Sequence, residues 1–200
     1  VLMMGGASLV VSSLVLADPL PTYSYFYSCA SGVENCADFS TSGTNALGES
    51  SSKIVVQGQG PIDIGYRASD GQVYCAFDCF GFDGGLGSGP INDNGIYFAN
   101  ADPSIEFGIL IGTNTTIGFN SYLGLPTIGP WENITANQFN EISGINSFFV
   151  SGLGINNSDQ ILVGYYDLAA SDRREGILSP TPVPEPSTFA LLAAVLCGLI

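Results

Sequence analysis

Residues 95–111 contain two short apolar runs, Gly95-Ile96-Tyr97-Phe98 and Ile105-Glu106-Phe107-Gly108-Ile109-Leu110-Ile111, separated by a segment rich in Asn, Asp, Pro and Ser. Runs of four to seven residues that are β-branched or aromatic and end at turn formers are typical of β-strands. The same pattern recurs along the chain and predicts further strands. These lie at residues 54–56, 73–77, 147–150 and 160–166.

Helical periodicity is weak throughout the chain. The best helical candidate is Asn133–Ile142, where Ile134, Phe139 and Ile142 share a face and Gly144 ends the pattern. The alternating Tyr23, Tyr25 and Tyr27 predict a first strand with the three rings on one face. Many short strands without βα alternation predict a mainly β protein, with a single antiparallel β-sandwich or jelly-roll-like domain.

The charge balance narrows the classes of partner. The chain carries 4 Lys and Arg against 18 Asp and Glu, a net charge of −14. This field repels phosphate, so we expect no nucleic-acid partner. The sequence has no histidine, which removes the usual general base of nucleophilic catalysis. We therefore expect a protein that is not an enzyme.

Four of the five cysteines form two close pairs, Cys29 with Cys36 and Cys75 with Cys79. In an exported protein an even set of cysteines indicates disulfides rather than a zinc site. Four cysteines allow three pairings, and the sequence does not choose among them. Pairing within each close pair is our working hypothesis. Free thiols in a reducing compartment are the alternative.

Two apolar segments lie outside the predicted domain. Residues 1–17 are uncharged and end in small-residue spacing before Asp18-Pro19, a pattern typical of a signal peptide cleaved between Ala17 and Asp18. The β-rich domain is expected over 18–178, followed by a proline-rich spacer over 179–188 and an apolar segment over 189–200. We interpret both terminal segments as truncated.

The segment Val183-Pro184-Glu185-Pro186-Ser187-Thr188-Phe189-Ala190-Leu191-Leu192 resembles the sorting signal of PEP-CTERM proteins of Gram-negative bacteria. In that family Pro-Glu-Pro precedes a transmembrane helix and a basic tail, and an exosortase processes the signal. The resemblance implies Pro184, Glu185 and Pro186 as the sorting motif and a transient inner-membrane anchor at 189–200. It covers about a tenth of the chain and says nothing of the domain before it.

A second resemblance lies at residues 154–165, Gly-Ile-Asn-Asn-Ser-Asp-Gln-Ile-Leu-Val-Gly-Tyr. It is similar to one unit of the extracellular HAF repeats, although Asp159 stands where that unit has glycine. An ordinary β-hairpin explains the same residues, and both interpretations stay open. No second copy is evident in the sequence, so a repeat propeller is not expected.

Acidic residues supply the remaining candidate sites. Glu106, Glu132 and Glu141 are the carboxylates available for glycoside hydrolysis, although solvated surface acids explain them equally well. A glycine-rich loop predicted over 77–94 carries Asp78, Asp83, Asp93 and Asn94, oxygen donors suited to Ca²⁺. Turn formation explains the same composition, because the order of an EF-hand is absent. We expect no resident cofactor, with Ca²⁺ as the alternative.

These features together predict an exported, non-enzymatic protein of the outer surface or extracellular matrix of a Gram-negative bacterium. The sorting signal implies an exosortase-type processing enzyme as its partner, and an exopolysaccharide or biofilm matrix as its surroundings. The alternative is a secreted glycan-active enzyme that uses paired carboxylates.

Overall fold

The computed structural model describes residues 20–29, 36, 39–56, 60–76, 89–100, 108–121 and 124–181, with the backbone alone at 52–56, 60–65 and 76. Over these residues the protein is mainly β, with twelve strands and one short helix. The strands form several sheets, which is compatible with the predicted β-sandwich class. None of the helices in this part of the chain is long and apolar enough to cross a membrane.

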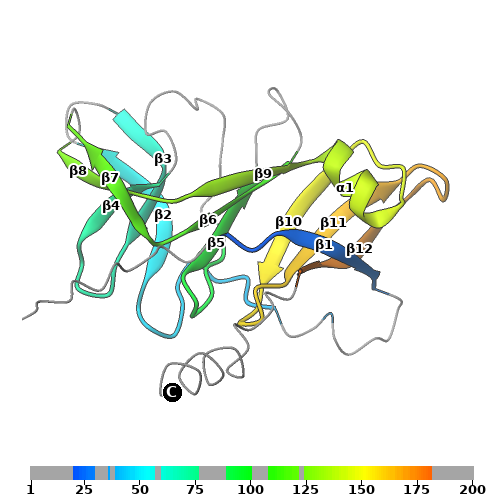
Figure 1. Cartoon of the computed structure of the whole chain (residues 1–200), viewed down its shortest axis with the longest axis horizontal. Coiled ribbons are helices and arrows are strands. Elements are labelled where there is room, and N and C mark those ends of the chain that lie inside the picture. The colour runs from blue at the N-terminus through cyan, green and yellow to red at the C-terminus, as the bar shows by residue number, and fades with distance from the viewer. Residues whose placement is uncertain are drawn as a thin grey trace, which may run out of the picture.

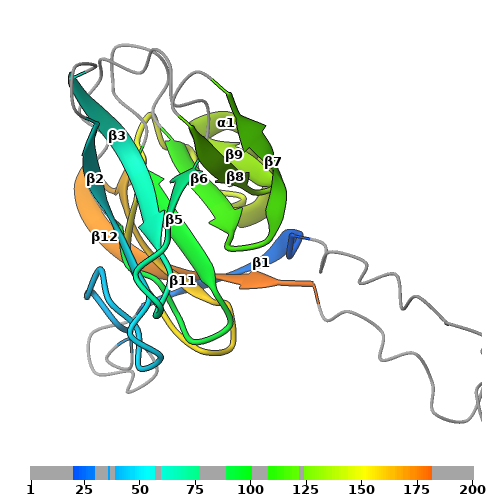
Figure 2. The same cartoon turned by 90° about the vertical axis from the view of Figure 1, so that its left-hand side faces the viewer.

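A four-stranded sheet forms one side of the molecule (Figure 1). Its strands lie in the order β1 (Tyr23–Ser28), β12 (Asp172–Pro180), β11 (Ile161–Asp167) and β10 (Val150–Ile155), and all neighbours are antiparallel. The first and last strands of the domain are therefore paired, with β1 alongside the end of β12 (Figure 2). This pairing brings the two ends of the described domain to the same place.

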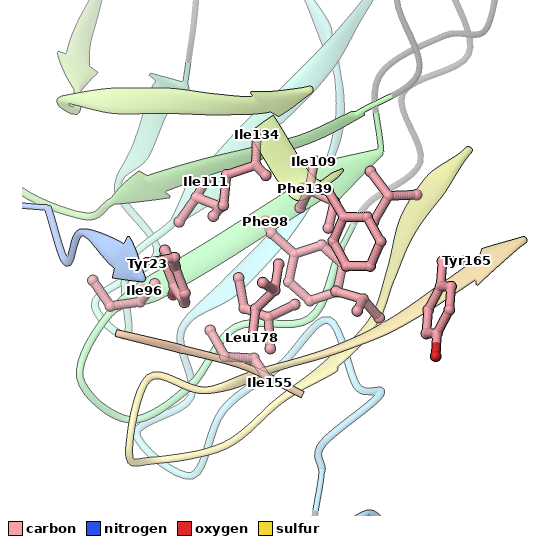
Figure 3. Packing of buried hydrophobic residues seen from close by; sticks show 13 residues of the cluster. Tyr23, Ile96, Phe98, Ile109, Ile111, Ile134, Phe139, Ile155, Tyr165 and Leu178 are labelled. Carbon is pink, nitrogen blue, oxygen red and sulfur yellow. The ribbon is translucent and has the colours of Figure 1, made fainter. Parts of the chain in front are cut away.

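A three-stranded sheet forms the middle layer. It consists of β5 (Ile96–Asn100), β6 (Gly108–Thr113) and β9 (Trp131–Thr135), in that order and antiparallel. One face packs on the four-stranded sheet in the main hydrophobic core, where Phe98 lies near Phe139 and Leu178 (Figure 3). The other face contributes Tyr97, Ala99 and Leu110 to a second core. The middle sheet is thus buried on both faces.

The five-stranded sheet lies on the other side of the middle layer. Its order is β2 (Ser50–Val56), β3 (Gly60–Arg67), β4 (Val73–Ala76), β8 (Leu125–Ile128) and β7 (Thr116–Asn120). The pair β4–β8 is parallel, in contrast to the predicted all-antiparallel arrangement. Seen from this side, β2 and β3 lie in front of β5 and β6 (Figure 2). The result is three layers, one more than a two-sheet sandwich.

The helix α1 (Ala136–Ser143) begins three residues later than the sequence predicts. Thr135 and Gln138 form a capping box, because the Thr135 hydroxyl accepts from the Gln138 N–H and the Gln138 side chain accepts from the Thr135 N–H. Ile134 belongs to β9 instead and packs in the main core. Gly144, with φ of 70°, ends the helix as predicted.

Several predicted strands shift in their bounds. Residues 147–149 form a loop, and β10 begins only at Val150. The polar segment after β11 enters β12, which includes Ser179 and Pro180 from the predicted spacer. Thr181 then donates its N–H to Thr22 O, so the ordered domain extends past residue 178. Residues 77 and 105–107 of the predicted strands lie outside the described residues.

Candidate functional site

The carboxylates predicted for glycoside hydrolysis lie on different elements where the structure describes them. Glu132 is exposed on β9 and Glu141 is exposed on α1, while Glu106 lies outside the described residues. Among the described residues no group of three or more His, Cys, Asp or Glu side chains could hold a metal ion. Asp78 and Asp83 of the predicted Ca²⁺ site also lie outside them.

The other two predicted Ca²⁺ ligands take part in hydrogen bonds between turns. The Asp93 carboxylate accepts from Ala46 N–H at 2.9 Å and from the Asn157 amide at 2.8 Å. The Asn94 amide donates to Asn157 O and to the Asp159 carboxylate, both at 2.9 Å. These oxygen and nitrogen atoms stabilise the loops of this region.

One predicted disulfide is present. Cys29 and Cys36 are bonded, with their Cα atoms 6.2 Å apart. Cys75 is also disulfide-bonded and is buried in β4. Its predicted partner Cys79 lies outside the described residues, so that pairing stays a prediction. A disulfide is consistent with an oxidising, extracellular environment.

Three five-residue turns share one hydrogen-bond pattern. We call them the Asn45, Asn92 and Asn156 turns, after their first residues (45–49, 92–96 and 156–160). In each, the first N–H donates to the fifth carbonyl and the fourth N–H donates to the first carbonyl. The side-chain oxygen of the leading Asn accepts from the third and fifth N–H groups at 2.9–3.1 Å. The fourth residue has positive φ: Gly48, Gly95 and Asp159.

The three turns stack on one another as an asparagine ladder. Asn45 Nδ2 donates to Asn92 O at 2.9 Å, and Asn92 Nδ2 donates to Asn156 O at 2.8 Å. The second residues of successive turns are also joined by a repeated hydrogen bond. Ala46 N–H donates to the Asp93 carboxylate, and Asp93 N–H donates to the Asn157 amide oxygen. Each turn therefore bonds the next in the same way.

The Asn156 turn lies within the HAF-like segment at residues 154–165, and the likeness of that segment to a HAF unit stays a prediction. In the described part of the chain two other turns share the geometry of the Asn156 turn, and the three turns begin 47 and 64 residues apart. The shared signal is an Asn followed three residues later by Gly or Asp, which is too short to stand out from chance. Packing of the turns reveals their equivalence.

The three tyrosines predicted to share one face of β1 lie on different faces. The register shifts between Tyr23 and Tyr25, so Tyr23 points into the core and donates its hydroxyl to Asp159 O at 2.7 Å. Tyr25 and Tyr27 are exposed, while Phe26 packs against Phe139. The prediction of three rings on one face is wrong because a β-bulge reverses the alternation. Burial, followed by the nearby charges of Asp159 and Glu132, raises the pKa of Tyr23.

A groove of about 260 Å³ lies on the four-stranded sheet. It is lined by residues of β10, β11 and β12 and the residue before β10: Phe149, Ser151, Leu153, Gly164, Tyr165, Arg173, Arg174 and Glu175. None of these residues was a predicted site residue, although Gly164 and Tyr165 lie in the HAF-like segment. The only local signal was the arginine pair, because the chain has four basic residues in all.

The sorting and cleavage residues lie outside the described residues. These are Pro184, Glu185, Pro186, Ala17 and Asp18.

No family model matches the chain, and no significant similarity to a curated protein or to a solved structure was found.

Proposed function

We propose that this protein is an exported PEP-CTERM-type component of the outer surface or extracellular matrix of a Gram-negative bacterium, and that it is not an enzyme. The observation that carries the proposal is the coincidence of Pro184-Glu185-Pro186 with the adjoining apolar run from Phe189. An exosortase-type enzyme processes the chain while residues 189–200 hold it at the inner membrane. The mature protein then resides in an exopolysaccharide or biofilm matrix.

The domain has features that suit this setting. The Cys29–Cys36 disulfide is favoured in an oxidising compartment. The β-rich body packs around two cores, and a net charge of −14 resists non-specific adhesion. The absence of histidine from the sequence favours a structural or binding role over catalysis.

Processing in the native host tests the proposal. Mass spectrometry of the mature protein is expected to show Asp18 as the N-terminus and no peptide from residues 189–200. Cys29, Cys36, Cys75 and Cys79 are all expected to be oxidised. A mature species that keeps residues 1–17 contradicts export. Free thiols in protein from the periplasm or medium contradict the predicted disulfides.

Two matched changes separate the shape of the sorting motif from its charge. Glu185→Gln keeps both fixed proline φ angles and removes the carboxylate, whereas the double change of Pro184 and Pro186 to Ala keeps the charge. Either variant is expected to leave uncleaved precursor in the membrane. Arg67→Gln, on β3 far from the motif in sequence, is the control and is expected to be processed normally. Normal release of both motif variants would mean that Pro-Glu-Pro is only a linker.

A further inference from the structure

The groove lies on the outer face of the four-stranded sheet. Ser151 pairs with Gly164, and Gly164 pairs with Glu175, so the three residues form one row across β10, β11 and β12. The neighbouring row contains Val150 and Tyr165, which are buried in the main core. Because successive side chains of a strand point to opposite faces, the row of Ser151, Gly164 and Glu175 faces away from the core.

Gly164 forms the floor of the groove. A Cβ atom at this position would stand 3.3 Å from Leu153 Cδ1 and 3.6 Å from Ser151 Oγ. Glycine therefore leaves space between its neighbours that any larger side chain would fill. Phe149 and Leu153 form an apolar wall on the β10 side.

The opposite wall carries two charges of opposite sign. Arg173 and Glu175 are two residues apart on β12, and both are exposed. Over the described part of the chain, neither side chain forms a hydrogen bond or ion pair with another residue. Arg174 differs, because its guanidinium lies 3.6 Å from the Asp167 carboxylate. Arg173 and Glu175 are thus available to a ligand.

This set of groups selects among ligand classes. Arg donates in a planar fork and Glu accepts through two oxygens, so adjacent hydroxyls that both donate and accept satisfy both side chains. The paired charges cancel locally, and the net charge of −14 disfavours a polyanion. The apolar wall suits a ligand with a C–H face. The groove opens on the face of the sheet rather than along the edge of β10. This position disfavours a peptide that would pair with β10 as an additional strand.

We propose that this groove binds one uncharged sugar residue of a glycan. Its hydroxyls lie between Arg173 and Glu175, and its C–H face packs on Phe149 and Leu153. The volume of about 260 Å³ is just below the ~300–1,000 Å³ of pockets for drug-sized molecules, which suits a ligand of this size. The inference deepens the proposed function by naming a partner class, but it rests on the groove and not on the sorting signal.

The test is a titration of the purified mature protein, followed by NMR, with uncharged hexasaccharides of β-1,4-glucose, β-1,3-glucose, β-1,4-N-acetylglucosamine and α-mannose. A hexamer of galacturonate is the polyanionic comparison. At least one uncharged oligosaccharide is expected to bind with a dissociation constant of about 1 mM or tighter, as a small open groove allows.

Groove variants locate the binding. Arg173→Gln and Glu175→Gln are each expected to weaken it by about tenfold or more, because each removes charge-assisted hydrogen bonds. Gly164→Leu fills the floor and is expected to abolish it. Arg67→Gln, an exposed arginine on β3, is the matched control and leaves binding unchanged. If Gly164→Leu does not fold, the two exposed charge variants decide.

Three results would overturn the proposal. They are no binding of any uncharged hexasaccharide at about 10 mM, binding that survives both charge changes, or binding of the galacturonate hexamer alone. None of these results bears on processing at Ala17 or Glu185, which is measured separately in the native host. Failure of the groove and failure of the sorting proposal are therefore distinguishable.

Discussion

Gly48 and Gly95 occupy the same place in two equivalent turns, with φ angles of 81° and 74°. Their surroundings differ. A Cβ atom at Gly48 would meet nothing within 4 Å, whereas one at Gly95 would lie 2.3 Å from the Asn114 amide nitrogen. Asn114 is held in turn by contacts with Glu49 and with the Tyr66 hydroxyl. Comparison of Gly48 with Gly95 therefore separates the need for a positive φ angle from the need for space beside the Cα atom.

Replacement of each glycine by alanine is expected to give different losses of stability. Gly48→Ala adds only the left-handed backbone strain, about 1 kcal/mol. Gly95→Ala adds the clash with Asn114 as well and is expected to cost about 3 kcal/mol. Urea unfolding followed by circular dichroism measures both. Equal losses would mean that Asn114 moves aside without cost.

At the scale of elements, the asparagine ladder joins hairpins that belong to different layers. The Asn45 turn precedes β2, the Asn92 turn precedes β5 and the Asn156 turn connects β10 to β11. Asn92 is the central member, and the residue is 2% exposed. Its amide donates to Asn156 O and to the Asp159 carboxylate, and its oxygen accepts from two N–H groups of its own turn.

Asn92→Ala is therefore expected to reduce the free energy of unfolding by about 3 kcal/mol, because several buried groups lose their partners together. The control is Asn137→Ala on the exposed face of α1, which is expected to change it by less than about 0.5 kcal/mol. Both are measured by urea unfolding. A loss below about 1 kcal/mol for Asn92→Ala would show that the ladder contributes little.

At the scale of the whole molecule, buried tyrosines link stability to alkaline pH. Tyr23 lies in the main core and Tyr97 in the second core, and burial is the main cause that raises the pKa of each. Burial, followed by the hydrogen bond to Glu49, raises the pKa of Tyr66 as well. An ordinary tyrosine has a pKa near 10. Ionisation above that pH thus favours the unfolded chain.

The sign of the pH dependence follows from these raised pKa values. Stability from a raised tyrosine pKa is fully present below about pH 10 and is lost as pH rises towards the folded pKa. The free energy of unfolding is expected to be steady near pH 8–9 and to fall above pH 10, by up to about 1.4 kcal/mol per pH unit for each buried tyrosine. Tyr23→Phe is expected to make this fall less steep. Tyr27→Phe, at an exposed position, is the control, and equal slopes in both variants would contradict the assignment.

The sequence by itself determined the β class and the Gly144 helix end, because these depend on local composition and spacing, whereas the sorting signal stays a prediction. The apolar runs at 95–98 and 105–111 predicted strands for the same reason. Apolar and polar residues do not alternate in these runs, as is typical of a strand buried on both faces. A short apolar run by itself does not distinguish such a strand from a segment of a buried helix. The sheets that pack on the two faces of these strands are formed by residues distant in the sequence.

Only the tertiary structure decided the rest. The bulge in β1 that buries Tyr23 and exposes Tyr25 depends on its register with β12, about 150 residues away. The polar segment at 172–175 becomes a strand because β11 supplies its hydrogen-bond partners. The groove brings Ser151, Gly164 and Glu175 together from three strands, and the asparagine ladder joins turns 47 and 64 residues apart. Contacts over such separations arise from chain topology, which local residue preferences do not specify.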